Sequence, residues 1–235
     1  MGAAPCTVDC PAPGLWVAQP RRGFRYAMDA ILLAGFAAEG GLPRALVDAG
    51  AGSGVVGLLL ARAGAGAVTL LDVRPEWRAA QEWSIRASGL AGRVTACTAD
   101  LRSWDGPPVD AVVMNPPYFS PRAGPVSPDP VRAAARSALH GSLGDLLAVL
   151  PRVGRRVCVV LPAGLEAAGV AGLAAGGAVL RRIVRLPPAF VLLEAGTPPS
   201  GAVDARCWPL PPGGAPPPGV QAWYASVGAR LGAAP

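Results

Sequence analysis

A short motif, Asn115-Pro116-Pro117-Tyr118, follows an apolar run over residues 111–114. The run predicts a short buried strand, and Pro116 ends it while holding Asn115 in an extended conformation. An asparagine side chain offers one carbonyl acceptor and two N–H donors. A planar amino group such as adenine N6 could donate to the Asn115 side-chain carbonyl and to the main-chain carbonyl of Pro116, while Tyr118 stacks on the ring. A plain turn after a strand uses the same residue types, so the motif alone leaves both interpretations open.

Residues 48–57, with the sequence DAGAGSGVVG, form a glycine-rich segment between a predicted strand and a predicted helix. Glycines at Gly50, Gly52 and Gly54 let the main chain turn tightly and pass close to a ligand. The segment fits the GxGxxG pattern of dinucleotide-binding folds, and Asp72 has the spacing of an acid that binds ribose hydroxyls. A nicotinamide dinucleotide is therefore one candidate ligand.

An acidic residue, Asp48, precedes these glycines and favours a different ligand. A sulfonium cofactor carries no phosphate. It needs a close main chain, an acid for its amino-acid portion and another acid for its ribose hydroxyls, and Asp48 and Asp72 fit these two tasks. The alternative for Asp72 is a turn residue at a strand end. For Asp100, which follows another predicted strand, the structural and the functional interpretation both stay open.

Strands and helices alternate around these residues, which predicts an α/β fold with a mostly parallel sheet and helices on both faces. Strands are predicted over residues 15–19, 45–47, 67–71, 93–98, 110–114 and 155–161, with a final antiparallel pair over 179–186 and 190–194. Helices are predicted over residues 27–38, 75–88, 142–150 and 164–175, and after the glycine segment to about residue 62. Residues 1–13 and the Pro- and Gly-rich residues 197–219 are expected to hold no regular structure.

The helix over residues 27–38 carries an acid in its first turn. Asp29 suits the positive end of the helix dipole there, which is a purely structural role. The functional alternative is that Phe24, Arg25, Tyr26 and Asp29 form a lid over a cofactor.

The composition indicates one domain over residues 1–235: a lid and helix segment at 1–40, a catalytic core at 41–196, and a Pro- and Gly-rich segment at 197–235. The net charge is +6 and all 21 basic residues are arginine, which permits a polyanionic partner. Five cysteines, without a CxxC pair and with His140 as the only histidine, argue against a metal site or a disulfide framework. The sequence has no signal-peptide pattern and no apolar segment that could span a bilayer, so we expect a cytoplasmic protein.

The glycine segment, Asp72, Asp100 and the motif at Asn115 resemble, in order and spacing, class I S-adenosylmethionine-dependent methyltransferases. The NPPY motif is similar to that of amino-methyltransferases acting on adenine N6, guanine N2 or glutamine side chains. The run from Gln19 to Leu33 resembles the bacterial tRNA (adenine-N6) methyltransferases that act on valine tRNA. The resemblance, over residues 19–196, implies a Rossmann-like class I methyltransferase fold with a mostly parallel seven-stranded sheet. It also implies S-adenosylmethionine as cofactor and RNA, in particular tRNA, as the partner.

The resemblance also implies a role for each matching residue. The cofactor-binding residues would be Tyr26, Asp48, Gly50, Gly52, Gly54, Asp72, Asp100 and Leu101. The catalytic residues would be Asn115, Pro116 and Tyr118. The family's lysines that contribute to RNA binding are missing from this chain, so arginines would have to replace them.

Two alternatives to adenine-N6 methylation of tRNA stay open. One is methyl transfer to another amino group, on an rRNA guanine, a release-factor glutamine, a DNA adenine or a small metabolite. The other is a dinucleotide-binding oxidoreductase or a non-catalytic cofactor-binding module.

Overall fold

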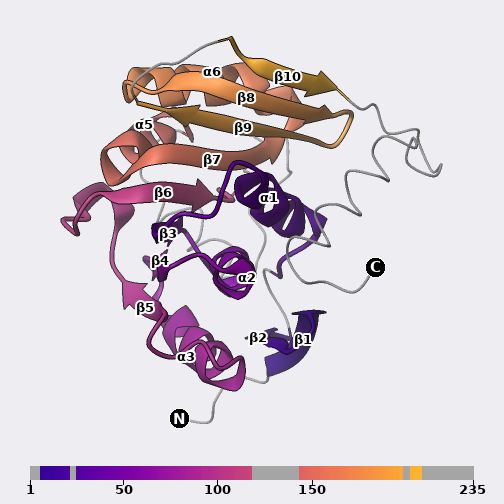
Figure 1. The fold of residues 1–235 in the computed structure, drawn as a ribbon, viewed down its shortest axis with the longest axis vertical. Coiled ribbons are helices and arrows are strands. Elements are labelled where there is room, and N and C mark those ends of the chain that lie inside the picture. The colour runs from indigo at the N-terminus through magenta and orange to yellow at the C-terminus, as the bar shows by residue number, and fades with distance from the viewer. Residues whose placement is uncertain (1–5, 22–24, 118–142, 198–201, 208–235) are drawn as a thin grey trace, which may run out of the picture.

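The computed structural model describes residues 6–21, 25–117, 143–197 and 202–207. Within them the chain forms an eight-stranded sheet with helices around it and a separate two-stranded hairpin (Figure 1). The strand order across the large sheet is β10-β8-β9-β7-β6-β3-β4-β5. These strands are β3 (Ala45–Ala49), β4 (Ala67–Asp72), β5 (Val94–Thr98), β6 (Val109–Met114), β7 (Gly154–Pro162), β8 (Val179–Leu186), β9 (Phe190–Gly196) and β10 (Asp204–Cys207).

The sheet is mostly parallel, as predicted. Strands β7, β6, β3, β4 and β5 pair in parallel, and in the described sheet β9 alone runs the other way, between β7 and β8. The predicted final antiparallel pair is thereby confirmed as β8 and β9. The chain order reverses between β6 and β3, and in open α/β sheets ligands bind beyond the carboxyl ends of the strands at such a reversal.

Helices cover both faces of the sheet because successive strand residues point to opposite sides. Leu46 of β3 belongs to a buried cluster with α1, α2 and α3, whereas its neighbour Val47 belongs to a second cluster with α5 and α6. The helices are α1 (Met28–Glu39), α2 (Val55–Ala63), α3 (Arg78–Ala87), α5 (Leu143–Val153) and α6 (Glu166–Ala175). Three short 3₁₀ turns join elements: η1 (Pro75–Trp77), η2 (Leu101–Ser103) and η3 (Ala163–Leu165). No helix in the described part of the chain is long and apolar enough to cross a membrane.

The expectation of an irregular start over residues 1–13 is wrong for the part that is described. Strand β1 (Cys6–Ala12) pairs antiparallel with β2 (Leu15–Pro20), so the beginning of the chain is a β-hairpin. The other edge of β2 is held by α3: the main-chain N–H groups of Trp16 and Ala18 donate to the hydroxyls of Ser88 and Ser84, each at 2.9 Å. The helix that holds β2 lies about 70 residues further along the sequence, and local composition therefore did not reveal the hairpin.

The strand count also differs from expectation. The resemblance implied seven strands, and the sheet has eight because β10 adds to the edge of β8 in parallel register. Strand β10 lies inside residues 197–219, where no regular structure was expected. Residues 204–207 contain neither proline nor glycine, and Arg206 forms an ion pair with Glu39 of α1 at 3.0 Å. The composition of the whole segment therefore concealed a short strand that a tertiary contact holds in place.

Candidate functional site

The glycine loop joins β3 to α2 at the carboxyl edge of the sheet. Gly50, Gly52 and Gly54 have φ angles of 67°, 53° and 81°, in the left-handed region that side chains other than glycine rarely adopt. The loop is anchored to the neighbouring strand, because the Ala51 N–H donates to the Leu71 carbonyl at 2.9 Å. The three glycines predicted from the sequence are therefore required by the backbone itself, and they leave the loop without bulky side chains.

Asp48 lies at the end of β3, directly beneath the start of α2. Its carboxylate is 2% exposed and accepts one hydrogen bond within the described residues, from the Gly57 N–H to Oδ2 at 2.8 Å. A Cβ on Gly57 would lie 2.5 Å from Leu70 Cδ2 and 3.1 Å from Asp48 Cβ, so glycine lets this approach form without moving its neighbours. Burial raises the pKa of Asp48 to about 7; the nearby Asp72 carboxylate adds to the rise, and the Gly57 hydrogen bond opposes it. A buried carboxylate that accepts a single hydrogen bond strongly attracts a cationic group.

Asp72 ends β4 and faces the same loop. Its Oδ2 accepts the Gly52 N–H at 2.8 Å, and its Oδ1 accepts the Arg74 N–H at 2.9 Å and Arg74 Nε at 3.2 Å. The Arg74 guanidinium lies over the Trp77 ring, 5.1 Å from its centroid. Gln81 of α3 completes the support by donating to the Gly52 carbonyl at 2.8 Å. The structure therefore brings Asp72 to the glycine loop, as its spacing predicted.

Arg74, Trp77 and Gln81 support the loop, and the sequence analysis missed all three. Their signal was weak, since an arginine two residues after a strand-end acid and polar residues in a following helix occur at many surfaces. Gln81 reaches the loop from α3, whereas Arg74 and Trp77 lie in the segment that leads from β4 into that helix.

Asp100 and Leu101 follow β5, on the far side of β4. Asp100 begins η2 by accepting the Arg102 N–H at 2.9 Å, and the Arg102 side chain also pairs with it at 2.6 Å. The hydrogen bonds from Arg102 lower the pKa of the Asp100 carboxyl. Leu101 is buried among the residues that pack against α5. These contacts are structural, and a cofactor role for the two residues stays a prediction.

The motif at the end of β6 lies one strand away from the glycine loop, because β6 pairs directly with β3. Asn115 is half-buried and Pro116 is buried. Asn115 Nδ2 donates to Asp29 Oδ2 of α1 at 3.0 Å, a contact between residues 86 positions apart. Tyr118 lies outside the described residues, as do Phe24 and His140.

Tyr26, expected to bind cofactor from a lid, is turned toward the N-terminal hairpin. Its N–H donates to Gln19 Oε1 at 3.3 Å, and its ring packs against the cluster under α1 and α2. Burial, helped by the Asp9 carboxylate, raises the pKa of the Tyr26 hydroxyl to about 12. Arg25 pairs with the same Asp9 at 3.1 Å. The hairpin thus holds the segment that leads into α1, and the role of Tyr26 toward a cofactor stays a prediction.

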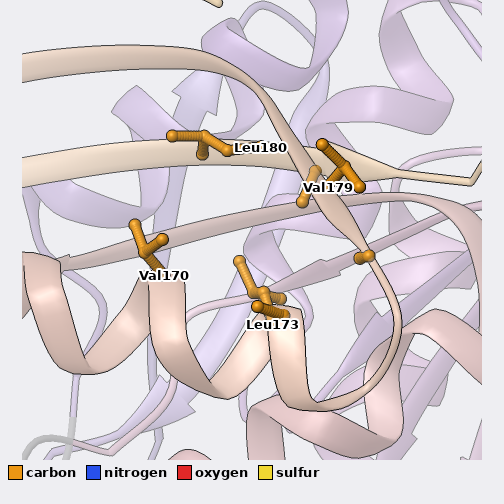
Figure 2. A pocket seen from close by; sticks show the side chains of 7 residues that line it. Val170, Leu173, Val179 and Leu180 are labelled. Carbon is orange, nitrogen blue, oxygen red and sulfur yellow. The ribbon is translucent and has the colours of Figure 1, made fainter. Parts of the chain in front are cut away.

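A cavity of about 180 Å³ lies elsewhere in the fold, between α6 and the strands β8 and β9. Figure 2 shows Val170 and Leu173 of α6 facing Val179 and Leu180 of β8 across it. Ala195 of β9 also lines the cavity, and it pairs with Val157 near the start of β7. The cavity is therefore at the amino end of the parallel strands. The cavity lining is apolar, and the cavity is not part of the site at the carboxyl edge.

The arrangement at the carboxyl edge favours one kind of ligand. Two carboxylates, Asp48 and Asp72, flank a loop of bare main chain. Carboxylates bind ammonium groups and sugar hydroxyls, and they repel phosphates. No group of three His, Cys, Asp or Glu side chains that could hold a metal ion occurs among the described residues. An amide that can bind an amino group lies beside the loop.

Comparisons with known proteins show what the sequence and the fold are similar to. The sequence profile of the methyltransferase small domain family matches residues 28–152. The tRNA1(Val) (adenine(37)-N6)-methyltransferase of Cronobacter sakazakii is 33% identical over 153 residues, which are 63% of this chain and 62% of that relative. The solved structure of a predicted O-methyltransferase from Agrobacterium tumefaciens matches at 21% identity with a TM-score of 0.59, over 88% of this chain and 98% of that chain. Ribosomal protein L11 methylase from Lactobacillus delbrueckii matches at 17% identity with a TM-score of 0.53, over 71% and 76% of the two chains.

The fold is that of the class I methyltransferases, as the sequence resemblance implied. The family profile covers more than half of the sequence, and the chain belongs to the methyltransferase small domain family. The chain matches 62% of the length of the curated relative from Cronobacter sakazakii.

Proposed function

We propose that this protein is an S-adenosylmethionine-dependent N-methyltransferase whose acceptor is the N6 amino group of an adenine in tRNA. The observation that carries the proposal is the Asn115-Pro116 elbow at the carboxyl end of β6, beside the glycine loop that follows β3. The names of the relatives, tRNA1(Val) (adenine(37)-N6)-methyltransferases, support adenine N6 in tRNA as the acceptor.

The residues at the glycine loop fit the proposed cofactor. The buried Asp48 carboxylate suits the ammonium of its amino-acid portion, and Asp72 suits its ribose hydroxyls. The left-handed glycines keep the main chain open to it. S-adenosylmethionine supplies a methyl group that is already activated by its sulfonium. The Asp48 carboxylate also argues against a dinucleotide, whose phosphates it would repel.

The chain's own residues then have to orient the acceptor nitrogen. Asn115 Oδ1 and the Pro116 carbonyl accept hydrogen bonds from the two N–H groups of the amino nitrogen. These bonds favour an sp³-like nitrogen and direct its lone pair toward the methyl group. No strong base is needed to activate this nitrogen. As the N–CH3 bond forms, the S–CH3 bond would break and S-adenosylhomocysteine would leave, and the cationic nitrogen would then release one of its two hydrogens to water. Tyr118, outside the described residues, is assigned to stacking on the base, which contributes about 1–3 kcal/mol.

RNA as the partner is supported by the charge of the chain. The net charge is +6, and every basic residue is an arginine, whose planar guanidinium pairs with phosphate through two parallel hydrogen bonds. A base in an anticodon loop is already accessible, so the enzyme would not have to open a duplex. RNA affinity should fall steeply as salt rises, because bound phosphates release counterions.

The test is a methyl-transfer assay on valine tRNA transcripts with purified protein and S-adenosylmethionine, followed by nucleoside mass spectrometry. We expect N6-methyladenosine in the wild-type transcript and none in a transcript whose adenine 37 is replaced by guanine. Asn115→Ala should lower kcat at least tenfold while the Kd for S-adenosylmethionine stays unchanged, because the amide contacts the acceptor and not the cofactor. The proposal would be contradicted if the protein methylated guanine N2 or a protein instead. It would also be contradicted if a folded, cofactor-binding protein methylated no substrate. A folded and fully active Asn115→Ala variant would contradict it as well.

A further inference from the structure

Asp29 makes two contacts with its two carboxylate oxygens, and only one of them belongs to its helix. Oδ1 accepts the Ala30 N–H at 2.8 Å, at the start of α1. Oδ2 accepts Asn115 Nδ2 at 3.0 Å, across the top of the sheet. The residue that precedes α1, Ala27, makes no side-chain capping bond. A structural role at the start of α1 therefore accounts for only one of the two oxygens.

The contact between Asp29 and Asn115 fixes the orientation of the Asn115 side-chain amide. An ionised carboxylate can only accept hydrogen bonds, so the amide must present its NH₂ group to Asp29. The amide is planar, and its carbonyl oxygen consequently lies on the branch directed away from Asp29. In the opposite orientation two oxygens would face each other, which is strongly unfavourable.

The helix that carries Asp29 is held firmly at its other end. Arg156 donates to the carbonyls of Gly40 and Gly41, and Arg182 donates to the carbonyl of Phe36. Most of the residues of α1 are buried against the sheet and α2. Since both the helix and β6 are fixed to the same core, the carboxylate is a rigid partner for the amide.

We infer that Asp29 is a positioning residue for methyl transfer: it turns the Asn115 carbonyl toward the acceptor amino group and strengthens it as an acceptor. This inference rests on the proposed function. A charged acceptor on the NH₂ side of an amide polarises it and increases the negative charge on its oxygen. That oxygen faces a nitrogen that becomes positively charged during methyl transfer, so the gain is largest in the transition state.

A first measurement tests the contact without any activity. Asn115 is the only asparagine in the chain, so selective ¹⁵N-asparagine labelling yields a single side-chain NH₂ signal pair. We expect this pair to move, and its hydrogens to exchange faster with water, in Asp29→Ala. The matched control is Asp110→Ala, because Asp110 also accepts main-chain N–H groups, from Arg44 and Ala45, but at the amino end of β6. An Asn115 signal pair that does not respond to Asp29→Ala would overturn the inference.

A second measurement tests the role in the reaction. Asp29→Ala should lower the single-turnover rate about 10- to 100-fold, the loss expected for one hydrogen bond to a charged group, with the Kd for S-adenosylmethionine unchanged. Asp29→Asn should recover part of the rate, because its carbonyl can still accept from Asn115. The control Asp110→Ala should leave the rate unchanged.

A double-mutant cycle separates positioning from a general structural effect. If Asp29 acts through Asn115, Asp29→Ala should slow the wild type but leave an Asn115→Ala protein no slower than before. Equal slowing in both backgrounds would refute a role through Asn115. A wild-type protein that methylates no RNA would instead refute the proposed function, and the labelled amide would still report the Asp29 contact.

Discussion

The pH dependence of cofactor binding offers a direct test of the role of Asp48. The pKa of this buried carboxyl is raised from 3.8 to about 7, and burial is the main cause. Since one pKa unit corresponds to about 1.36 kcal/mol, ionising Asp48 in the ligand-free protein costs on the order of 4 kcal/mol more than in water. A cationic ammonium placed against this carboxylate would offset that cost, so the ligand should bind the ionised form.

The expected magnitude follows from the fraction of Asp48 that is already ionised. With a pKa near 7 in the free protein, lowering the pH from 7.0 to 5.5 should weaken S-adenosylmethionine binding about 15-fold. Above about pH 7 the ligand's own α-amino group loses an appreciable share of its proton, so the assay should stop there. Asp48→Asn keeps an acceptor for the Gly57 N–H but carries no charge, and its weaker binding should not vary over this range.

Isothermal titration calorimetry in two buffers of different ionisation enthalpy measures both the affinity and the protons released. We expect up to one proton released per ligand near pH 6 for the wild type and none for Asp48→Asn. The stability of the ligand-free protein should also depend on pH. Because the pKa of Asp48 is higher in the folded than in the unfolded state, the unfolding free energy should fall as the pH rises from 5 to 7 and then level off. Asp48→Asn should show no such fall. Affinities for wild type and variant that are equal and independent of pH would refute the reasoning.

Two further predictions concern the neighbouring acid and the core. Asp72→Ala should weaken S-adenosylmethionine binding by about 1.5–3 kcal/mol in calorimetry, the scale of a hydrogen bond to a charged group, and an unchanged Kd would exclude it as a ligand. Arg182→Met should lower the unfolding free energy by about 3–5 kcal/mol in urea, because it removes the arginine 2.8 Å from the Glu194 carboxylate, which is only 8% exposed. The exposed Arg78–Glu82 pair is the control, and Arg78→Ala should cost less than about 1 kcal/mol; equal losses would contradict the argument.

Much of the core fold was predictable because its signals are local. The strand, glycine loop and helix at residues 45–63 follow from an apolar run, glycines and a second apolar run. The pairing of β8 with β9 follows from two apolar segments of suitable length joined by a short proline turn. Strand β1 and strand β10 were missed because each is stabilised by a partner far along the sequence, α3 through β2 in one case and Glu39 in the other.

In the candidate site, too, some features follow from the local sequence and others only from tertiary packing. Sequence alone determined the residue types at the carboxyl edge: glycines where the main chain must be left-handed, acids at the ends of β3 and β4, and an asparagine before a proline at the end of β6. Spacing along the chain can locate such residues, since each follows a strand.

The tertiary structure alone decided what these side chains touch. Asp29 and Asn115 are 86 residues apart, and they meet because α1 and β6 pack into one core with their ends at the same edge. Gln81 of α3 and Gly52 of the glycine loop are 29 residues apart, and they meet because α3 packs with its first turns beside the loop. A hydrogen bond requires its donor and acceptor to lie within about 3 Å and in line. That precision depends on the relative placement of whole elements, which the packing of both faces of the sheet determines and local sequence does not encode.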